Sequence, residues 1–233
     1  MEHAVKMVRM PEEKMMGNLI QAGKLDQVHI DTLVDKLTPF YQQADRTPEI
    51  DGYGTAESVA VNVLENFEQT KGFIGNGAIS QEQFDKISSW AKDFLTQEEL
   101  FNQRIKEGNI RDCHGDLYSA NICLADKVYI YDCIEFNRRF RYCDVASDIG
   151  FLAMDLDFHG LQELSAYCID QFCQHSGDST LKEMLNFYKC YRAYVRGKIG
   201  LFTASDPAVD EAVKKSCLEA AAKYFALAES YTN

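Results

Sequence analysis

The chain has 233 residues, 46% of them hydrophobic, which is enough for one large folded domain or two small ones. Its 24 basic and 36 acidic residues give a formal net charge of -12, which argues against a surface for nucleic acids or anionic membranes. No apolar stretch is long enough to span a membrane and the first residues lack the features of a signal peptide, so we expect a cytoplasmic protein. The eight cysteines match no metal-ligand spacing and are expected to be reduced and mostly buried.

Most of the predicted elements are helices. Residues 3–10 resemble a short strand, and Pro11 with the acidic pair after it resembles the first turn of a helix. Hydrophobic spacing predicts helices over 25–44, 56–70 and 80–105, with a loop at 46–55 and a capping box that begins at Ser80. Residues 121–132 predict a hairpin about an Ala-Asp-Lys turn, and helices follow over 143–156, 160–175, 179–202 and 207–231. The expected fold class is therefore α+β, mostly helical, with one small hairpin in mid-chain.

The segment around this hairpin carries the residue types of a phosphoryl-transfer site. His114 and Asp116 flank a glycine, Asn121 follows five residues after Asp116, and Asp132 ends the hairpin. Such a site needs a carboxylate that accepts the proton of the attacking hydroxyl, and oxygen ligands that hold Mg²⁺ beside the nucleotide phosphates. We therefore expect Asp116 to be the catalytic base, Asn121 and Asp132 to hold the metal, and His114 to brace the catalytic loop. An ordinary acidic turn would explain His-Gly-Asp alone, but not the Asn and Asp that follow it.

The segments HGDLYSANICL (114–124), VYIYDCIEF (128–136) and CDVASDIGFLAMDL (143–156) resemble the aminoglycoside phosphotransferase and choline kinase-like family. The resemblance implies a protein-kinase-like fold, of which the chain would be mainly the large lobe. It also implies ATP and Mg²⁺ as cofactors, a hydroxyl of a small molecule as acceptor, and a supporting role for Asp144 and Asp148 behind the catalytic loop. Gly115 stands where protein kinases have an Arg that senses a phosphate, which favours a small-molecule kinase.

Two features of a kinase are absent from the sequence, namely a G-x-G-x-x-G loop and a clear ATP-binding lysine. Two interpretations of the N-terminus stay open. Either Lys6 is that lysine, or residues 1–11 are the last strand of the small lobe and the hinge, with backbone groups of Val8 and Met10 facing adenine. The spacing between Lys6 and Asp116 favours the hinge. Residues 12–233 would then be the large lobe, nearly inactive alone, and a second copy or a partner would supply the small lobe.

Four residues are weaker candidates for the acceptor site. Asp155 and Asp157 would edge the acceptor cleft and could receive an amine. Arg192 and Arg196 share a helix face and could hold an anionic acceptor, although pairing with the carboxylates of the 144–157 helix is the simpler interpretation. The sequence does not name the acceptor.

The leading functional hypothesis is a small-molecule kinase. One alternative is a kinase-like module that binds a ligand or partner without chemistry, because the glycine-rich loop is absent. A second alternative is a metal-dependent phosphohydrolase, because Asp, Asn and His also bind metals.

Overall fold

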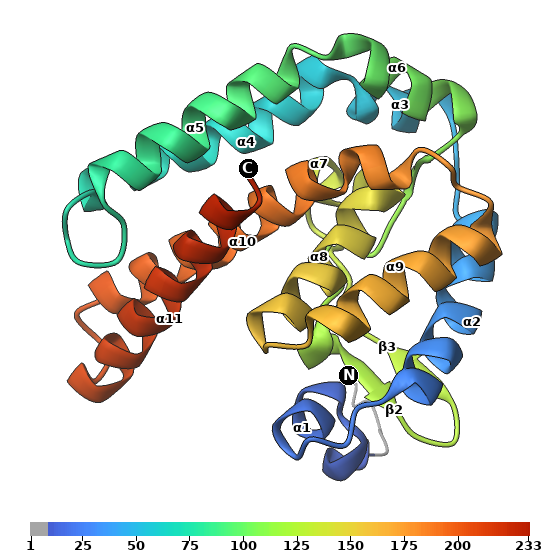
Figure 1. Ribbon diagram of the computed structural model, residues 1–233, viewed down its shortest axis with the longest axis horizontal. Coiled ribbons are helices and arrows are strands. Elements are labelled where there is room, and N and C mark those ends of the chain that lie inside the picture. The colour runs from blue at the N-terminus through green and yellow to red at the C-terminus, as the bar shows by residue number, and fades with distance from the viewer. Residues whose placement is uncertain (1–8) are drawn as a thin grey trace, which may run out of the picture.

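The computed structural model describes residues 9–233, which form a mostly helical α+β protein with small antiparallel sheets, as predicted (Figure 1). The predictions made for Lys6 and Val8 lie outside the described residues. The α-helices are α1 Met16–Gln21, α2 Gln27–Gln43, α3 Pro48–Asp51, α4 Ala56–Thr70, α5 Gln81–Leu95, α6 Glu98–Glu107, α7 Arg138–Arg141, α8 Val145–Phe158, α9 Gln162–Ser176, α10 Leu181–Ser205 and α11 Glu211–Ser230. Single 3-10 turns are η1 Glu12–Lys14, η2 Gly52–Gly54, η3 Lys71–Phe73 and η4 Ser119–Asn121.

The strands form two separate antiparallel pairs. The predicted hairpin is confirmed as β2 Ile122–Leu124 and β3 Val128–Ile130, with Ile122 opposite Ile130. The second pair, β1 Ile110–Asp112 with β4 Tyr142–Asp144, was not predicted from the sequence. Its strands flank the 113–141 segment, so the pair closes the base of the loop that carries the hairpin and the His-Gly-Asp motif.

The helix predicted over 80–105 is in fact two helices, α5 and α6, and the prediction of one continuous helix was wrong. The chain leaves helical geometry at Gln97, which has φ -82° and ψ 56°. Just before it, the hydroxyl of Thr96 donates to the carbonyl of Asp93 at 2.7 Å and so satisfies a carbonyl group at the end of α5. The capping box at the start of α5 is confirmed, with Ser80 and Gln83 bonded to each other's backbone N–H groups.

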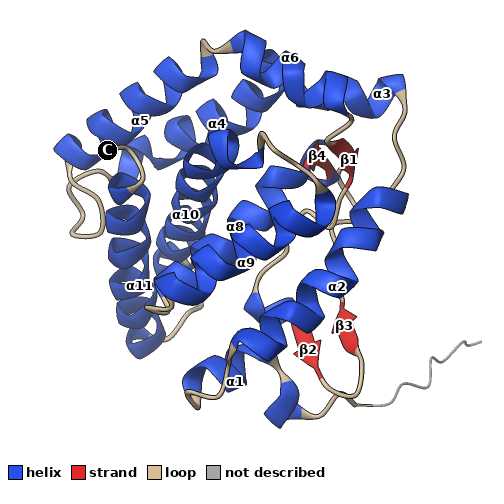
Figure 2. Cartoon of the chain, turned by 45° about the vertical axis from the view of Figure 1, so that its right-hand side comes forward, coloured by secondary structure: helices blue, strands red, loops and turns tan. Residues whose placement is uncertain are grey.

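Helix α8 occupies the centre of the molecule, between α9 and α10 (Figure 2). Every residue from Val145 to Asp157 is buried. A helix that is buried all round has no solvent-facing side for its polar residues, so each of its carboxylates must find a partner within the protein. This burial decides the environment of Asp144, Asp148, Asp155 and Asp157.

The sequence also predicts that the protein has no membrane-spanning segment and that its cysteines are reduced and mostly buried. No helix within residues 9–233 combines the length and apolarity that crossing a bilayer requires. All eight cysteines are free thiols, of which Cys113, Cys123, Cys168 and Cys190 are buried, Cys133 is exposed and the other three are half-buried.

Candidate active site

The His-Gly-Asp motif forms a tight loop between β1 and η4, and its glycine has a backbone reason to be there. Gly115 has φ +83°, in the left-handed region that other residues avoid. A Cβ atom at this position would lie 2.8 Å from the carbonyl oxygen of Phe140 and 2.9 Å from Cγ1 of Ile134. Both the backbone conformation and the crowding at this position therefore require glycine. The sequence analysis had explained Gly115 only by the absence of the Arg that protein kinases have there.

The carboxylate of Asp148 holds this loop from behind. Its Oδ2 accepts the backbone N–H of His114 at 2.8 Å, and its Oδ1 accepts that of Gly115 at 3.0 Å. The hydroxyl of Tyr41 donates to Oδ2 at 3.0 Å. Asp148 is 0% exposed, so these bonds form where no solvent competes with them. Tyr41 lies 107 residues away along the chain, and the sequence analysis did not identify it.

Arg192 supports the same loop from α10. Its Nη1 donates to the carbonyl of Gly115 at 2.8 Å, and its Nε and Nη2 donate to the hydroxyl of Ser147 at 3.2 and 3.0 Å. Nη2 also lies 3.7 Å from Oδ1 of Asp148. The guanidinium is buried and its donors serve the loop, so Arg192 occupies a structural position rather than one open to an acceptor.

Asp116 and Asn121 are in direct contact. Nδ2 of Asn121 donates to the backbone carbonyl of Asp116 at 3.0 Å and to its carboxylate Oδ2 at 3.1 Å. Burial raises the pKa of the Asp116 carboxyl, and the nearby guanidinium groups of Arg192 and Arg196 oppose that rise. A raised pKa makes the carboxylate a better proton acceptor near neutral pH, which is the property that a general base needs.

His114 is fixed by hydrogen bonds at both ring nitrogens. Its Nε2 lies 2.9 Å from the carbonyl oxygen of Tyr131, and its Nδ1 accepts the backbone N–H of Asp116 at 3.3 Å. The carbonyl can only accept, so the network assigns the proton to Nε2. The ring is 6% exposed and joins the loop to the end of β3, which is a bracing position.

Asp132 lies beside the loop because backbone hydrogen bonds flank it on both sides. The N–H of Tyr131 donates to the carbonyl of Asn121 at 3.1 Å, and that of Ile134 donates to the carbonyl of His114 at 2.9 Å. Asp132 itself has φ +61°, which is uncommon outside glycine. Its side chain is exposed, and it forms no hydrogen bond with any residue from 9 to 233. The structure thus brings Asp116, Asn121 and Asp132 to one loop region.

The oxygen atoms of this region suit a magnesium ion that keeps part of its water better than they suit a metal ion held entirely by protein side chains. The amide nitrogen of Asn121 is used by Asp116, which leaves its Oδ1 as the atom able to bind a cation. Within residues 9–233 no three His, Cys, Asp or Glu side chains gather as a metal site would require. A metal held by Oδ1 of Asn121 and the carboxylate of Asp132 would need water and ligand oxygens to complete its shell, which is how Mg²⁺ is usually bound.

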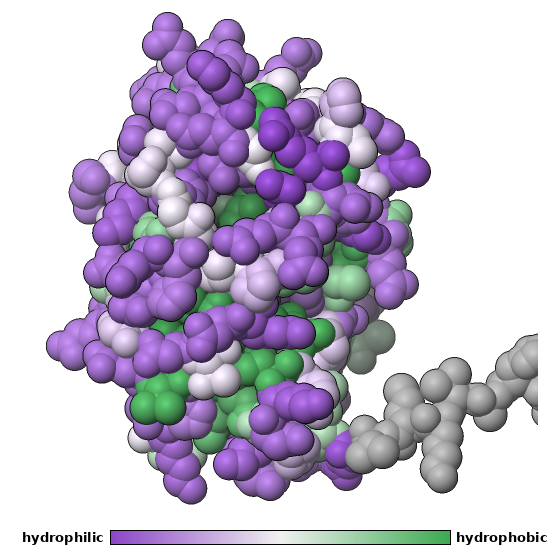
Figure 3. Space-filling view, turned by 90° about the vertical axis from the view of Figure 1, so that its right-hand side faces the viewer, coloured by the Kyte–Doolittle hydropathy of each residue, from purple (hydrophilic) through white to green (hydrophobic). Residues whose placement is uncertain are grey.

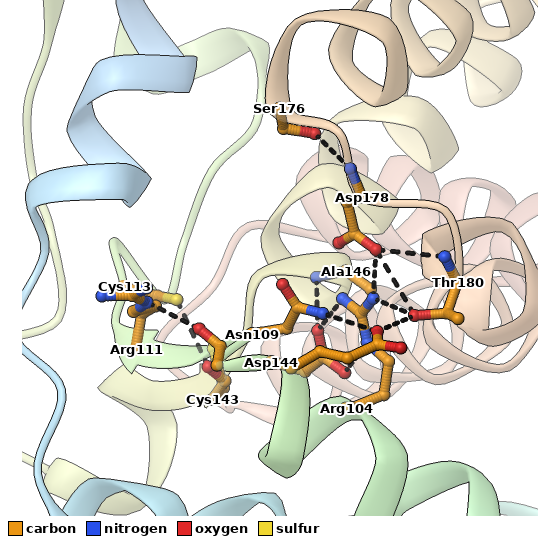
Figure 4. A network of polar contacts seen from close by, with 12 residues as sticks. Arg104, Asn109, Arg111, Cys113, Cys143, Asp144, Ala146, Ser176, Asp178 and Thr180 are labelled. Atoms are coloured by element: carbon orange, nitrogen blue, oxygen red, sulfur yellow. Dashed lines mark hydrogen bonds and ion pairs between the residues drawn. The ribbon is translucent and has the colours of Figure 1, made fainter.

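Asp144 has a structural partner that the sequence analysis missed. Nε and Nη2 of Arg104 donate to its two carboxylate oxygens at 2.9 and 2.6 Å, and the backbone N–H of Ala146 donates to Oδ1 at 2.8 Å. Nη1 of Arg104 reaches Asp178 and, at 2.8 Å, the hydroxyl of Thr180 (Figure 4). Arg104 is 0% exposed, so Asp144 caps α8 and ties it to α6 through a buried ion pair.

The other acceptor candidates are placed differently from one another. Asp155 is 2% exposed and accepts the backbone N–H of Ser119 at 3.0 Å. Asp157 does receive an amine, but it is the ammonium of Lys189, and the hydroxyl of Tyr231 donates to the same oxygen at 2.6 Å. Both carboxylates are buried on α8 and bonded within the protein, so neither is free to receive an amine from an acceptor as the sequence suggested.

Arg196 differs from these residues because no carboxylate of residues 9–233 pairs with it. Its Cζ atom lies 4.9 Å from the centre of the Tyr118 ring and 5.7 Å from that of Tyr224. Met10, the described half of the predicted hinge pair, is half-buried just before Pro11.

A cavity of about 690 Å³ lies beside the loop, on the side of α2. His114, Tyr131 and Cys133 line it together with Phe40 and Lys36 of α2, whereas Asp116, Asn121 and Asp132 do not.

Figure 3 shows one face of the molecule, hydrophilic over most of its area, with apolar residues gathered in its lower part.

Comparison with known proteins gives relatives but no function. No family model matches the chain. It is 34% identical over 200 residues to uncharacterized protein Rv2004c of Mycobacterium tuberculosis and, to the same extent, to uncharacterized protein Mb2027c of Mycobacterium bovis. The aligned region covers 85% of this chain and 40% of each relative. The chain therefore spans about two fifths of the length of the curated relatives it matches.

Proposed function

We propose that the chain is the large lobe of a protein-kinase-like fold, in a phosphotransferase that resembles the aminoglycoside phosphotransferase and choline kinase-like family. It transfers the γ-phosphoryl group of ATP to a hydroxyl of a small molecule. One observation carries the proposal. Asn121 donates to both the backbone and the carboxylate of Asp116, while Asp132 lies beside the same loop with its side chain unbonded among the described residues.

In this proposal each residue of the loop has one role. Asp116 orients the acceptor hydroxyl and takes its proton, helped by the burial that raises the pKa of this carboxyl. Asn121 and Asp132 would hold Mg²⁺, which when bound neutralises charge on the nucleotide phosphates. His114 and Arg192 hold the loop in shape. Phosphoryl transfer depends mainly on positioning and electrostatics, so the rigid support of the loop by Asp148 favours this chemistry.

The glycine-rich loop and the ATP-binding lysine of the proposed kinase belong to a small lobe outside residues 12–233. A further segment, a second copy or a partner chain supplies it. The greater length of the curated relatives is compatible with such a segment.

The first test is calorimetric titration of the chain with ATP and Mg²⁺, comparing Asp132→Asn with Asp126→Asn. Asparagine tolerates the left-handed backbone of Asp132, so the first variant removes charge with little strain. Asp126 lies exposed in the turn of the same hairpin and serves as the matched control. We expect metal-dependent binding that weakens about tenfold or more in Asp132→Asn, a loss of about 1.4 kcal/mol, and is unchanged in Asp126→Asn.

Asp116→Asn should retain this binding and abolish phosphoryl transfer by the complete protein. The proposal fails if the parent shows no metal-dependent nucleotide binding, or if the two hairpin variants bind equally well.

A further inference from the structure

A second cavity, of about 270 Å³, lies away from the Asp116 region, where α2, α6, α8 and α9 meet. Thr38 and Tyr41 of α2, Glu107 at the end of α6, and Asp178 after α9 are among the residues that line it. Its volume is slightly below the range of pockets that take drug-sized ligands, so it suits a small one.

The carboxyl ends of two helices lie at this cavity. Helix α6 ends at Glu107 and α9 at Ser176, and each is followed by a lining glycine in the left-handed region, Gly108 with φ +83° and Gly177 with φ +73°. The carboxyl end of a helix carries partial negative charge. The carboxylates of Glu107 and Asp178 lie at the same place, and Arg104 pairs with that of Asp178.

The donors of the positive groups nearby are bonded to protein oxygens, as Nη2 of Arg46 is to the carbonyl of Ile105 at 2.7 Å. Val145 brings the amino end of α8 to the cavity, but its N–H donates to the carbonyl of Asn109 at 2.9 Å. Arg111 also lines the cavity, and its Nε and Nη1 donate to the carbonyls of Gly108 and Ala44 at 2.8 and 3.0 Å. The cavity therefore offers acceptors more than donors.

Two of the oxygens on lining residues are buried without a hydrogen-bond partner in residues 9–233, Oγ1 of Thr38 and Oδ2 of Asp178. Thr38 is 7% exposed, and the side chain of Asp178 is 5% exposed. Other helical threonines bond to their own helix, as Thr32 does to the carbonyl of Val28 at 2.8 Å, but Thr38 does not. Buried polar atoms are nearly always paired in folded proteins, so two such atoms on residues that line one small cavity need an explanation.

The direction of Asp178 supplies that explanation. Its Oδ1 accepts from Arg104 and Thr180, whereas its other oxygen turns away from both, toward the side of Asn109 and Arg111 (Figure 4). Asn109 and Arg111 line the cavity as well. A buried carboxylate oxygen without a donor is unfavourable, and a ligand N–H group would offset this.

From this geometry we infer that the cavity is a binding site for a small organic ammonium ion. The ammonium donates to Oδ2 of Asp178 and to the hydroxyl of Thr38, and Glu107 at the exposed rim contributes charge. This inference does not depend on the proposed phosphotransferase function. Tyr41 connects the two regions, since it lines this cavity and donates to Asp148 behind the loop.

The test is a titration with butylammonium chloride followed by NMR chemical shifts, with butan-1-ol as the neutral probe of the same size. Thr38→Val removes the unpaired hydroxyl without leaving a polar atom, so the variant is expected to fold. Glu107→Gln removes the rim charge, and Glu99→Gln is the matched control on an exposed position of the same helix. Asp178 is left intact because Arg104 depends on it.

We expect saturable binding of butylammonium but not of butan-1-ol, with shifts at residues that line the cavity. Affinity should fall about two- to fivefold in Glu107→Gln, because this charge lies at the exposed rim, and about two- to tenfold in Thr38→Val, and stay unchanged in Glu99→Gln. Three outcomes would overturn the inference. They are equal binding of the alcohol, equal weakening by both glutamate variants, and saturation of the same shifts by potassium chloride at the same concentration.

Discussion

Two groups of aspartates surround the same loop, and they differ in how completely they are bonded. The inner pair, Asp144 and Asp148, is at most 1% exposed and is bonded to Arg104, Tyr41 and backbone N–H groups. The outer pair, Asp116 and Asp132, is half-buried or exposed, and Asp132 bonds to no described side chain. Stability is thus concentrated behind the loop, while oxygens with unused bonding capacity face outward. Such a division is typical of sites where function is favoured over stability.

The largest expected effect tests the inner pair. Arg104→Met would leave the carboxylates of Asp144 and Asp178 buried without their cation, which should lower the free energy of unfolding by about 3–5 kcal/mol. Urea denaturation measures it. Arg138→Met is the control, because its ion pair with Glu49 is exposed and contributes about 1 kcal/mol or less. Equal losses in both variants would show that the inner pair does not stabilise the fold as described.

A second substitution tests the shape of the loop itself. Gly115→Ala and Gly160→Ala both place a Cβ atom on a left-handed residue, which is unfavourable by about 1–2 kcal/mol. Only at Gly115 does that atom meet crowded neighbours, so this variant should lose roughly a further 1–3 kcal/mol. Thermal and urea unfolding of the two variants give the difference. If they lose the same amount, the loop is looser than its contacts with Phe140 and Ile134 indicate.

A smaller loss is expected when only the hydroxyl behind Asp148 is removed. Burial raises the pKa of Tyr41, so the phenol stays protonated and donates to Asp148 at any ordinary pH. Tyr41→Phe should therefore lower the free energy of unfolding by about 1.5–3 kcal/mol, the range for hydrogen bonds to charged groups. Tyr167→Phe removes a similar bond to Asp31 in a half-exposed position and should lose less. The reverse order would contradict the importance of the buried network.

The sequence predicted local features well and long-range partners poorly. The helices over 25–44 and 56–70, the capping box at Ser80 and the hairpin follow from periodicity and turn chemistry, and the structure confirms them. The loop predicted over 46–55 in fact contains the short helix α3. The pairing of β1 with β4 was missed, because three-residue strands leave almost no pattern. The contact between Asp116 and Asn121 joins residues five positions apart, so spacing alone could suggest it.

Partners that come from distant helices left no such signal. Arg104 lies 40 residues from Asp144, and Tyr41 lies 107 from Asp148. The same reason explains the acceptor candidates on α8. Nothing in the local sequence indicated that Lys189 of α10 would pair with Asp157. Burial of the whole helix, which is a tertiary property, decided the role of its carboxylates.

The smallest expected effect separates the outer pair from the inner one by its sign. Burial raises the pKa of Asp116 in the folded protein above its unfolded value. The stabilisation linked to its proton is therefore complete below the unfolded pKa and is lost as the pH rises through the folded pKa. Asp116→Asn has no charge to bury and can still accept from Asn121. It should be more stable than the parent at about pH 7, by up to about 1 kcal/mol, with a gap that closes toward about pH 4.

Urea denaturation of both proteins across this pH range measures the gap. An active-site carboxylate is expected to be held at some expense of stability, so a stabilising substitution supports the outer assignment of Asp116. A variant less stable than the parent at about pH 7 would mean that Arg192, Arg196 and Asn121 favour the ionised form more than burial penalises it. Asp116 would then belong with Asp144 and Asp148 as a structural carboxylate, and the proton acceptor of the site would have to be sought elsewhere.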